Sequence, residues 1–424
     1  MLYLQPIMKR NDIEVMAPAG SYESLMAAIQ GRADSVYFGV EQLNMRAASS
    51  NNFTIADLRK IASICKENRI KSYLTVNVVV YDHEIEQMHK IIDAAVESGI
   101  TAVIASDLSV INYASSAGIE VHLSTQLNIT NIEALKFYAR WADVVVLARE
   151  LNLDQVGYIF RNISEQNITG PKGDLIKIEM FVHGALCMAI SGKCYLSLHE
   201  NNKSANRGEC YQTCRKSYLA TNMETGYEIE IDNEYIMSPK DLCTIGFLNK
   251  LVNSGVRVLK IEGRARSAEY VREVSSCYNE ALMAIEDGTF TREKTDAWKA
   301  RLSTVFNRGF WDGYYLGQTM GEWNTNYGSS ATKRKIYIGK ITNYFKKLNV
   351  AEIKLENGDL DKGDTILITG PTTGVFEYQV DEIRVDLIVA EKALKGELCS
   401  IKTHEYLRRS DKVYKWVDSH ENKS

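Results

Sequence analysis

The chain has 424 residues, of which 45% are hydrophobic and 25% are charged, and its formal net charge is −4. This composition is normal for a soluble globular protein, and the small net charge excludes a polycation, so any contact with nucleic acid must be local. The first residues, MLYLQPIMKRND, contain no extended apolar segment, and no apolar run approaches the length of a membrane span. We therefore expect a cytoplasmic protein without a secretory signal and without membrane contact.

Short β-rich runs alternate with helical patterns from residue 13 onward. The expected strands cover residues 13–20, 35–40, 71–80, 102–107, 120–127, 143–151, 177–184 and 257–263. Nearly continuous apolar strands that alternate with helices indicate a parallel sheet, and eight such units match a (β/α)8 TIM-like barrel in number and length. A doubly wound α/β sheet is the alternative, but no G-x-G-x-x-G follows the first strand.

The most unusual stretch is a polar loop, residues 184–218, which contains four of the eight cysteines. Cys187, Cys194, Cys210 and Cys214 follow the spacing C-x6-C-x15-C-x3-C. Such a loop has no core of its own, and thiolates that converge on a metal would supply the free energy that orders it. Reduced structural thiols and two disulfides are the alternatives, but disulfides are rare in the cytoplasm. Structural zinc usually takes two closely spaced cysteine pairs, so this irregular spacing favours an iron–sulfur cluster over zinc.

Polar side chains stand at the carboxyl ends of several expected strands, where the chemistry of a TIM barrel takes place. The candidates are Asn77, Gln126, Asn128, Arg149, His183, Lys260, Glu262 and Arg264. Together they predict a small-molecule pocket, and the cysteine loop emerges on the same face, so its metal would lie over the barrel mouth. The alternative is that Arg149–Glu150 and Lys260–Glu262 are ion pairs that support the strand ends.

The composition changes after the linker YGSSATKRK, residues 327–335. The following segments alternate apolar and polar residues and are separated by Asn-Gly, Lys-Gly and Gly-Pro turns. This pattern predicts a small antiparallel β-barrel at residues 334–407, separate from the core of a first domain at residues 1–325. Residues 408–424 are charged and are expected to form a frayed tail.

Several motifs resemble the signature of the collagenase-like peptidase family U32. The main motif is EMFVHGALCMAISGKCYLS, and the others are MAPAG, the Ser124-Thr125-Gln126 strand end, NRGEC-x3-CR, SPKDL, KIEGR and FNRGF. The resemblance covers nearly the whole chain. Within the family, the chain is most similar to members that form 5-hydroxyuridine at the wobble position of tRNA, because of its C-x3-C pair, its length and its last domain.

The resemblance implies an oxygen-independent hydroxylase that holds a 4Fe–4S cluster on the four loop cysteines and takes its hydroxyl group from prephenate. Arg149 and Arg264 would grip the two carboxylates of this donor, and His183 and Glu262 would exchange protons. Asn77, Gln126, Asn128 and Lys260 would complete the binding site. The expected macromolecular partner is the tRNA anticodon arm, with Lys333, Arg334 and Lys335 near its phosphates. Iron–sulfur assembly or electron-transfer proteins are further expected partners.

Three other functions remain open from the sequence. A collagenase-like peptidase would need a hydrolytic residue set, but neither H-E-x-x-H nor G-x-S-x-G is present. A sibling iron–sulfur hydroxylase would act on ribosomal RNA or on a ubiquinone precursor. A non-enzymatic RNA-binding module would bind tRNA without changing its nucleosides.

Overall fold

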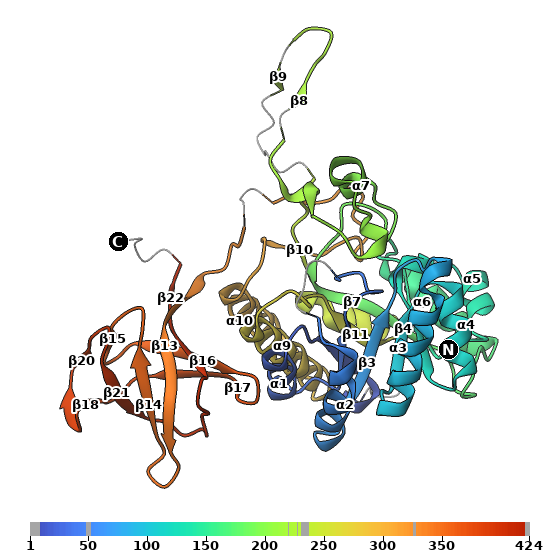
Figure 1. Ribbon diagram of the computed structural model, residues 1–424. Helices are drawn as coiled ribbons and strands as arrows, with labels where there is room; N and C mark the ends of the chain where they lie inside the picture. Colours follow the sequence, from blue (N-terminus) through green and yellow to red (C-terminus); the bar gives the residue numbers. More distant parts are fainter. Residues whose placement is uncertain are drawn as a thin grey trace.

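Eight parallel strands form the closed barrel that the sequence predicts. A computed structural model describes residues 9–47, 52–218, 220–226, 228–229, 237–324 and 328–419 (Figure 1). The barrel strands are β1 (Glu14–Pro18), β2 (Ser35–Phe38), β3 (Lys71–Val76), β4 (Ala102–Ala105), β5 (Glu120–Leu123), β6 (Val144–Val146), β7 (Lys177–Ala185) and β11 (Val256–Ile261). Each strand pairs in parallel with the next, and β11 pairs with both β7 and β1, which closes the ring.

Amphipathic helices surround the barrel. They are α1 (Tyr22–Gln30), α2 (Leu58–Glu67), α3 (Ile85–Ser98), α4 (Leu108–Ser116), α5 (Ile132–Tyr138), α6 (Leu153–Glu165), α8 (Leu248–Asn253), α9 (Ala268–Glu286) and α10 (Arg292–Thr304). In α2 the buried residues Leu58, Ile61, Ala62 and Cys65 recur at helical spacing, so one stripe of the helix faces the barrel. Local signals set the helix ends: the Ser21 hydroxyl accepts the Ser24 N–H at 3.2 Å at the start of α1.

The cysteine loop and two short strands interrupt the last barrel unit. After β7 the chain forms the loop with α7 (Leu196–Asn201) and a short ribbon of β8 (Ala220–Thr221) and β9 (Glu228–Ile229), which projects from the barrel in Figure 1. It returns through β10 (Asp241–Cys243), which lies antiparallel to the end of β7 and pairs with β12 (Phe310–Trp311). The loop therefore starts and ends at the carboxyl end of β7.

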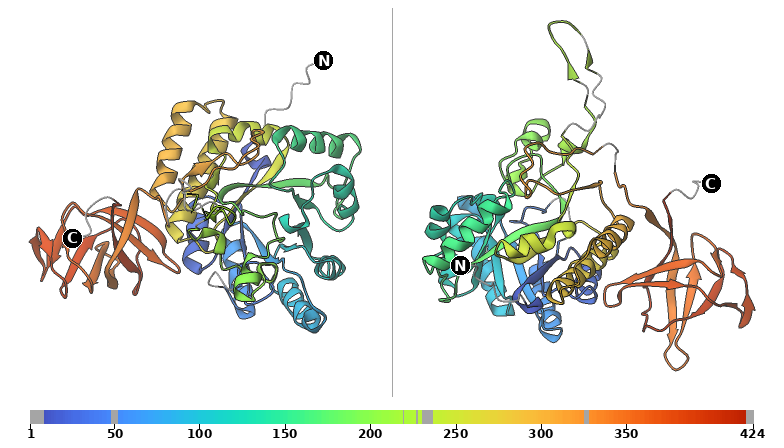
Figure 2. Two further views of the ribbon diagram at one scale, coloured as in Figure 1. Left: turned by 90° about the horizontal axis from the view of Figure 1, so that it is seen from above. Right: turned by 180° about the vertical axis from the view of Figure 1, so that it is seen from behind.

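The C-terminal domain is an antiparallel sheet wrapped around its own core, beside the barrel (Figure 2). Its strands are β13 (Lys333–Phe345), β14 (Val350–Leu355), β16 (Thr365–Gly370), β17 (Gly374–Gln379), β18 (Ile383–Val385), β19 (Ile388–Ala390), β21 (Leu398–Lys402) and β22 (Lys412–Asp418), with a ribbon of β15 (Leu360–Asp361) and β20 (Lys392–Ala393). The strand order is β17-β16-β22-β13-β14-β21-β18-β19. The fold class is thus the one predicted, a TIM-like barrel followed by a small antiparallel domain.

The expected frayed tail is wrong for residues 412–418, which form strand β22 in the middle of this sheet. β22 pairs with β13 on one side and with β16 on the other. The strand contains two lysines and one aspartate, but its apolar side chains are buried: Val413 is fully buried and Trp416 is 8% exposed. The charged composition of residues 408–424 does not predict this strand, because a strand is stabilised by the packing of its buried side chains against the neighbouring strands.

The two domains share part of their packing. Gln30 on α1 accepts the Val375 N–H at 2.9 Å and donates to the Thr373 carbonyl at 3.0 Å. Val375, Leu367 and Trp416 join the core of the barrel domain rather than that of the sheet. The C-terminal domain therefore has its own core but docks on α1 and α9. Among the described residues, no helix combines the length and the apolar character that a membrane span requires.

Candidate active site

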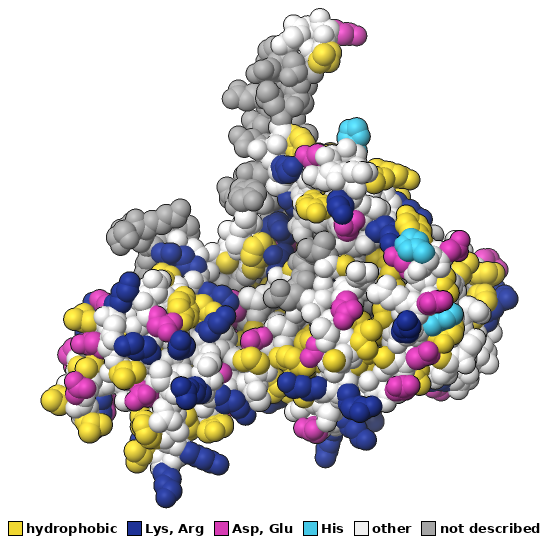
Figure 3. All heavy atoms as spheres, in the orientation of Figure 1, with side chains coloured by type: hydrophobic (Ala, Val, Ile, Leu, Met, Phe, Trp, Pro, Cys, Tyr) yellow, Lys and Arg dark blue, Asp and Glu magenta, His cyan; other side chains and the backbone are white. Residues whose placement is uncertain are grey.

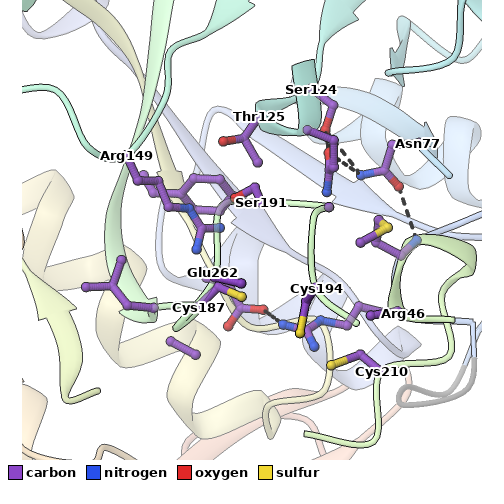
Figure 4. Close-up of a pocket in the computed structure, with 18 of the residues that line it drawn as sticks. Arg46, Asn77, Ser124, Thr125, Arg149, Cys187, Ser191, Cys194, Cys210 and Glu262 are labelled. Atoms are coloured by element: carbon purple, nitrogen blue, oxygen red, sulfur yellow. Dashed lines mark hydrogen bonds and ion pairs between the residues drawn. The ribbon is translucent and has the colours of Figure 1, made fainter. Parts of the chain in front are cut away.

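A cavity of about 170 Å³ opens at the carboxyl ends of the barrel strands, under the cysteine loop. Barrel residues form its floor and walls: Tyr37, Thr75, Asn77, Ile104, Ser124, Gln126, Arg149, Phe181, Lys260, Glu262 and Arg264. Its roof comes from the loop and includes Met188, Ser191 and all four loop cysteines. Two segments that are far apart in sequence thus enclose one space (Figure 4).

The four loop cysteines share this cavity as free thiols. Figure 4 shows Cys187, Cys194 and Cys210 pointing toward one region of the roof. Burial raises the pKa of Cys214 to about 11, and the other three cysteines add to this shift, as expected for thiols that lie near one another. In the described part of the chain, no three Cys, His, Asp or Glu side chains already surround a single point as a metal site would require.

Ion pairs and hydrogen bonds to the barrel hold the cysteine loop in place. Arg207 in the loop pairs with Glu84 at 2.6 Å and donates to the Val79 carbonyl at 2.6 Å. Arg215 donates to the Leu186 carbonyl at 2.7 Å and to the Ser238 hydroxyl at 2.9 Å. These two arginines therefore hold the loop in place, and an RNA phosphate would have to compete with their partners in the protein.

Arg149 presents a guanidinium group to the cavity. Its central carbon lies 4.1 Å from the centre of the Phe181 ring, which holds it by a cation–π contact. Its buried Nε atom has no hydrogen-bond partner in the described part of the chain, and the ion pair with Glu150, which the sequence left open as the alternative, does not form there. A buried donor without a partner is costly, so this geometry suits an anionic ligand.

The other two predicted cations are already held by protein groups. Arg264 donates to Asn44 Oδ1 at 2.9 Å and to Thr75 Oγ1 at 2.8 Å, and burial lowers its pKa to about 10. Lys260 Nζ lies 2.6 Å from Glu179 Oε1 inside the barrel, so it does not pair with Glu262. Arg264 therefore keeps its positive charge at the cavity wall, and burial lowers the pKa of Lys260 although Glu179 opposes this effect. The hydrogen bonds of both side chains are made to the protein.

Arg46 is the site residue that sequence reasoning missed. It lies in the loop after β2, lines the cavity and pairs with Glu262 at 2.8 Å. Burial would raise the pKa of Glu262, but Arg46 and Arg266 outweigh it, so this carboxyl stays ionised. No periodic or strand-end signal marks Arg46, because the loop that carries it is positioned only by the folded barrel.

A chain of amides and hydroxyls forms the opposite wall. Asn77 Nδ2 lies 3.3 Å from Ser124 Oγ and 3.4 Å from Gln126 Oε1, and Ser124 also contacts Gln126. Asn128 does not line the cavity; it donates to the Ser191 carbonyl at 3.3 Å and so ties the wall to the roof. The predicted polar strand ends therefore meet, with Asn128 in a supporting position.

His183 lies outside the cavity. It is 1% exposed, and its ring packs against the rings of Tyr270, Tyr278 and Phe310. Burial, with a smaller effect of Arg266, lowers its pKa to about 3, so the imidazole is neutral at pH 7. Its position at the end of β7 turns it toward β10 and the outer helices, away from a ligand in the cavity. The expected proton exchange by His183 has no contact to support it.

The fold and the cavity define a TIM-barrel protein whose cavity is lined by several cationic side chains and roofed by four thiols. Residues 20–325 match peptidase family U32, and the chain belongs to this family.

Similar proteins carry two kinds of name. A protein of Porphyromonas gingivalis named collagenase is 60% identical over 96% of this chain and 99% of its own length. A tRNA hydroxylation protein of Bacillus subtilis is 31% identical over 87% of this chain and 86% of its own length. The 23S rRNA 5-hydroxycytidine synthase of Escherichia coli is 32% identical over 94% of this chain and 59% of its own length.

Proposed function

We propose that this protein hydroxylates an RNA base without oxygen, and that its product is 5-hydroxyuridine at the wobble position of tRNA. Relatives named for tRNA hydroxylation and for ribosomal 5-hydroxycytidine synthesis support an RNA substrate. The tRNA relative matches this chain over most of both lengths, including part of the C-terminal domain, whereas the ribosomal relative is much longer.

The observation that carries the proposal is Arg149, whose buried Nε lacks a partner in the described chain and whose guanidinium group lines the cavity. A guanidinium group binds a carboxylate through two parallel hydrogen bonds. The proposed hydroxyl donor is a small dicarboxylate of the prephenate type, with one carboxylate on Arg149. Arg264 and Lys260 add positive charge behind it, and Asn77 and Gln126 offer amide groups to its hydroxyl substituents.

The proposed cofactor is a 4Fe–4S cluster on Cys187, Cys194, Cys210 and Cys214. The fit rests on the donor set: four free thiols line one cavity, and neighbouring thiols add to the effect of burial in raising the pKa of Cys194 and Cys214. A metal that binds thiols gathered in this way takes them as thiolates. Arg46 beside Glu262 adds positive charge near Cys210. When bound, such a cluster supplies redox-active iron at the roof of the cavity. Arg149 and the amide wall would orient the donor beneath it.

The peptidase name of one relative suggests the second candidate. A cysteine peptidase needs a thiolate paired with a histidine. No histidine lines the cavity among the described residues, and burial raises the pKa of both Cys194 and Cys214 rather than lowering it. These two features favour hydroxylation over peptide hydrolysis by a cysteine nucleophile.

In this proposal the RNA reaches the cavity with one base and contacts the C-terminal domain with its backbone. Figure 3 shows many Lys and Arg side chains on the C-terminal domain, interspersed with acidic ones. Two of the three lysines and arginines expected near phosphates already have acidic neighbours: Lys335 lies 2.9 Å from Glu269 and Lys333 lies 3.9 Å from Glu377. RNA binding would therefore compete with these pairs and should weaken with salt.

The nucleoside profile of a deletion strain tests the proposal. Total tRNA from cells without this gene should lose 5-hydroxyuridine and its derivatives, and the wild-type gene should restore them. The matched complementation uses Arg149→Ala and, as a control on the exposed surface, Arg292→Ala. Unchanged tRNA nucleosides in the deletion strain, together with cleavage of denatured collagen by the purified protein, would favour the peptidase instead.

A further inference from the structure

A row of alternating charges runs through the barrel interior from its amino-terminal face to the cavity. In order, the row contains Lys172, Glu120, His122, Glu179 and Lys260. Lys172 precedes β7 and its side chain is 55% exposed, whereas Lys260 lines the cavity at the other end. The three middle residues lie on β5 and β7, so the barrel wall fixes their spacing. We call this row the charge ladder.

The contacts along the charge ladder are short. Lys260 Nζ lies 2.6 Å from Glu179 Oε1, and His122 Nε2 lies 3.2 Å from Glu120 Oε1. Lys172 Nζ contacts Glu120 Oε2 at the solvent end. The side chains of Glu179 and His122 are 0% and 1% exposed, so water reaches this row only at its ends.

The middle link is a pair of facing atoms that have no other partner. His122 Nδ1 and Glu179 Oε2 lie 3.4 Å apart, slightly beyond a normal hydrogen bond. Neither atom has a hydrogen bond to any other group in the described chain. A small rotation of the imidazole ring would bring these two atoms into hydrogen-bonding distance. A pair with a purely structural role would be expected to form this hydrogen bond already, because buried polar atoms are normally hydrogen-bonded.

The carboxylates on either side of His122 favour its protonated form. Burial opposes ionisation of His122, but Glu120 and Glu179 outweigh it and raise its pKa. Burial likewise opposes ionisation of Glu120, yet contacts with His122 and Lys172 lower its pKa to about 2. The other facing groups are Tyr73 on β3, whose ring centre lies 4.5 Å from that of His122, and Glu14 on β1, which accepts the Tyr73 hydroxyl.

Stability gives little reason for such a row. Buried ion pairs often contribute less than well-packed apolar side chains of the same volume, because desolvation offsets their attraction. The neighbouring interior of this barrel does use apolar and aromatic side chains, among them Met16, Ile104 and Val258. A continuous ionisable path that ends at the cavity therefore points to proton movement.

We propose that the charge ladder is a proton relay that restores the charge of Lys260 from the opposite face of the barrel. Lys260 gives a proton to the ligand in the cavity and takes one from Glu179, which takes one from His122 Nδ1. His122 regains a proton at Nε2 from Glu120, which is supplied by Lys172 or directly by water. One proton enters at the solvent end for each proton that leaves Lys260, so the row returns to its starting state. The proposed function enters only through the ligand that receives the proton.

The first experiment follows exchange of the His122 ring protons with water. Protein labelled with ¹⁵N-histidine is studied by NMR, and His122→Gln assigns the signal. Glu120→Gln removes the carboxylate that joins His122 to solvent and should slow the exchange at least tenfold. The matched control is Glu14→Gln, which changes another carboxylate at the same barrel face outside the row and should leave the rate within about twofold.

If both variants exchange at the wild-type rate, or both slow equally, protons reach His122 by opening of the barrel and the relay is refuted. Amide spectra and melting temperatures show whether each variant is folded. If Glu120→Gln does not fold, Lys172→Met serves in its place, because the Lys172 side chain is half-exposed and tolerates change. Slower exchange in Lys172→Met supports the relay, and exchange at the wild-type rate overturns the entry of protons through Lys172.

The second experiment separates the relay from the proposed function. In a 5-hydroxyuridine assay, Glu120→Gln should lower kcat about tenfold with little change in KM and should alter the pH profile, whereas Glu120→Asp should restore much of the rate. A protein that hydroxylates no RNA but shows exchange dependent on Glu120 would overturn the proposed function and leave the relay. Normal kcat and normal exchange in Glu120→Gln would overturn the relay and leave the function.

Discussion

Arg46 and Glu262 are 216 residues apart in sequence and join across the cavity by an ion pair of 2.8 Å. The pair ties the loop after β2 to the residue that follows the last barrel strand, β11. Because Arg46 lowers the pKa of Glu262, this carboxyl is ionised and cannot donate a proton to a ligand in the cavity. The floor of the site is therefore closed by tertiary contact rather than by any local motif.

Breaking this pair should destabilise the fold. Glu262→Gln leaves Arg46 without its carboxylate, and we expect a loss of about 2 kcal/mol in the free energy of unfolding, as for a hydrogen bond to a charged group. Urea denaturation measures it, with Arg46→Met completing a double-mutant cycle. The matched control is Glu133→Gln, which breaks an exposed pair with Lys136 and should cost less than about 0.5 kcal/mol. Equal effects in both variants would contradict a structural pair at the cavity.

Replacing any loop cysteine should remove the proposed cluster. Protein purified without oxygen should be brown and contain iron and sulfide, and Cys187→Ala or Cys214→Ala should lose the colour because a four-thiolate site loses a ligand. Cys65→Ala is the control, since Cys65 is buried in α2 away from the cavity. Stoichiometric zinc without iron in the anaerobic protein would refute the cluster.

Removing Arg149 should weaken donor binding without unfolding the protein. Its Nε bonds to no described residue, so Arg149→Ala leaves no carboxylate unpaired, and its melting temperature should change little. Calorimetric titration should show that the affinity for prephenate is reduced more than tenfold in Arg149→Ala, because the bidentate contact with one carboxylate is lost. Arg149→Lys keeps the charge but not the two-pronged geometry and should recover only part of the affinity. Unchanged binding in Arg149→Ala would remove this residue from the site.

His183 should make the fold sensitive to acid. Its pKa is near 3 in the folded protein and near 6.5 when exposed, so the unfolded chain takes up a proton between these values and the folded chain does not. The contribution of His183 to stability should therefore be constant above about pH 6.5 and fall as the pH decreases toward 3. Urea denaturation from pH 7 to pH 4 should give a shallower decrease for His183→Phe than for the wild type. The exposed-site control His199→Gln should keep the wild-type slope.

Strand β22 should be indispensable to the C-terminal domain. A chain that ends at Leu407 loses the strand between β13 and β16 and the buried side chains of Val413 and Trp416. We expect limited proteolysis to digest its remaining C-terminal residues while the barrel resists. A chain that ends at Ser419 keeps the whole strand and should resist digestion. Resistance of the shorter chain would show that the charged tail is dispensable after all.

Much of this fold could be predicted because its signals are local. Each barrel strand is a short apolar run, and helix starts such as Ser21 are set by side chains next to them in sequence. The site was predictable where the barrel topology decides it: Asn77, Arg149 and Lys260 meet because parallel strands end at one face.

The sequence could not predict contacts that depend on the folded barrel. Arg46 reaches the cavity through a loop, and His183 sits at a strand end yet faces the outer layer, because β10 pairs beside it. Strand alternation can tell two faces apart, but it cannot say which face meets a ligand when both are buried. The charge ladder was missed for the same reason: Glu179 and His122 lie within strands that read as ordinary core segments.

The transfer of labelled oxygen tests the central claim most directly. Anaerobically purified protein is incubated with unmodified tRNA and with prephenate that carries ¹⁸O in its ring hydroxyl, and the nucleosides are analysed by mass spectrometry. The cavity as described predicts 5-hydroxyuridine that contains ¹⁸O, formed by the wild type and absent with Arg149→Ala. Unmodified uridine under these conditions, or 5-hydroxyuridine whose oxygen comes from water or O2, would contradict it.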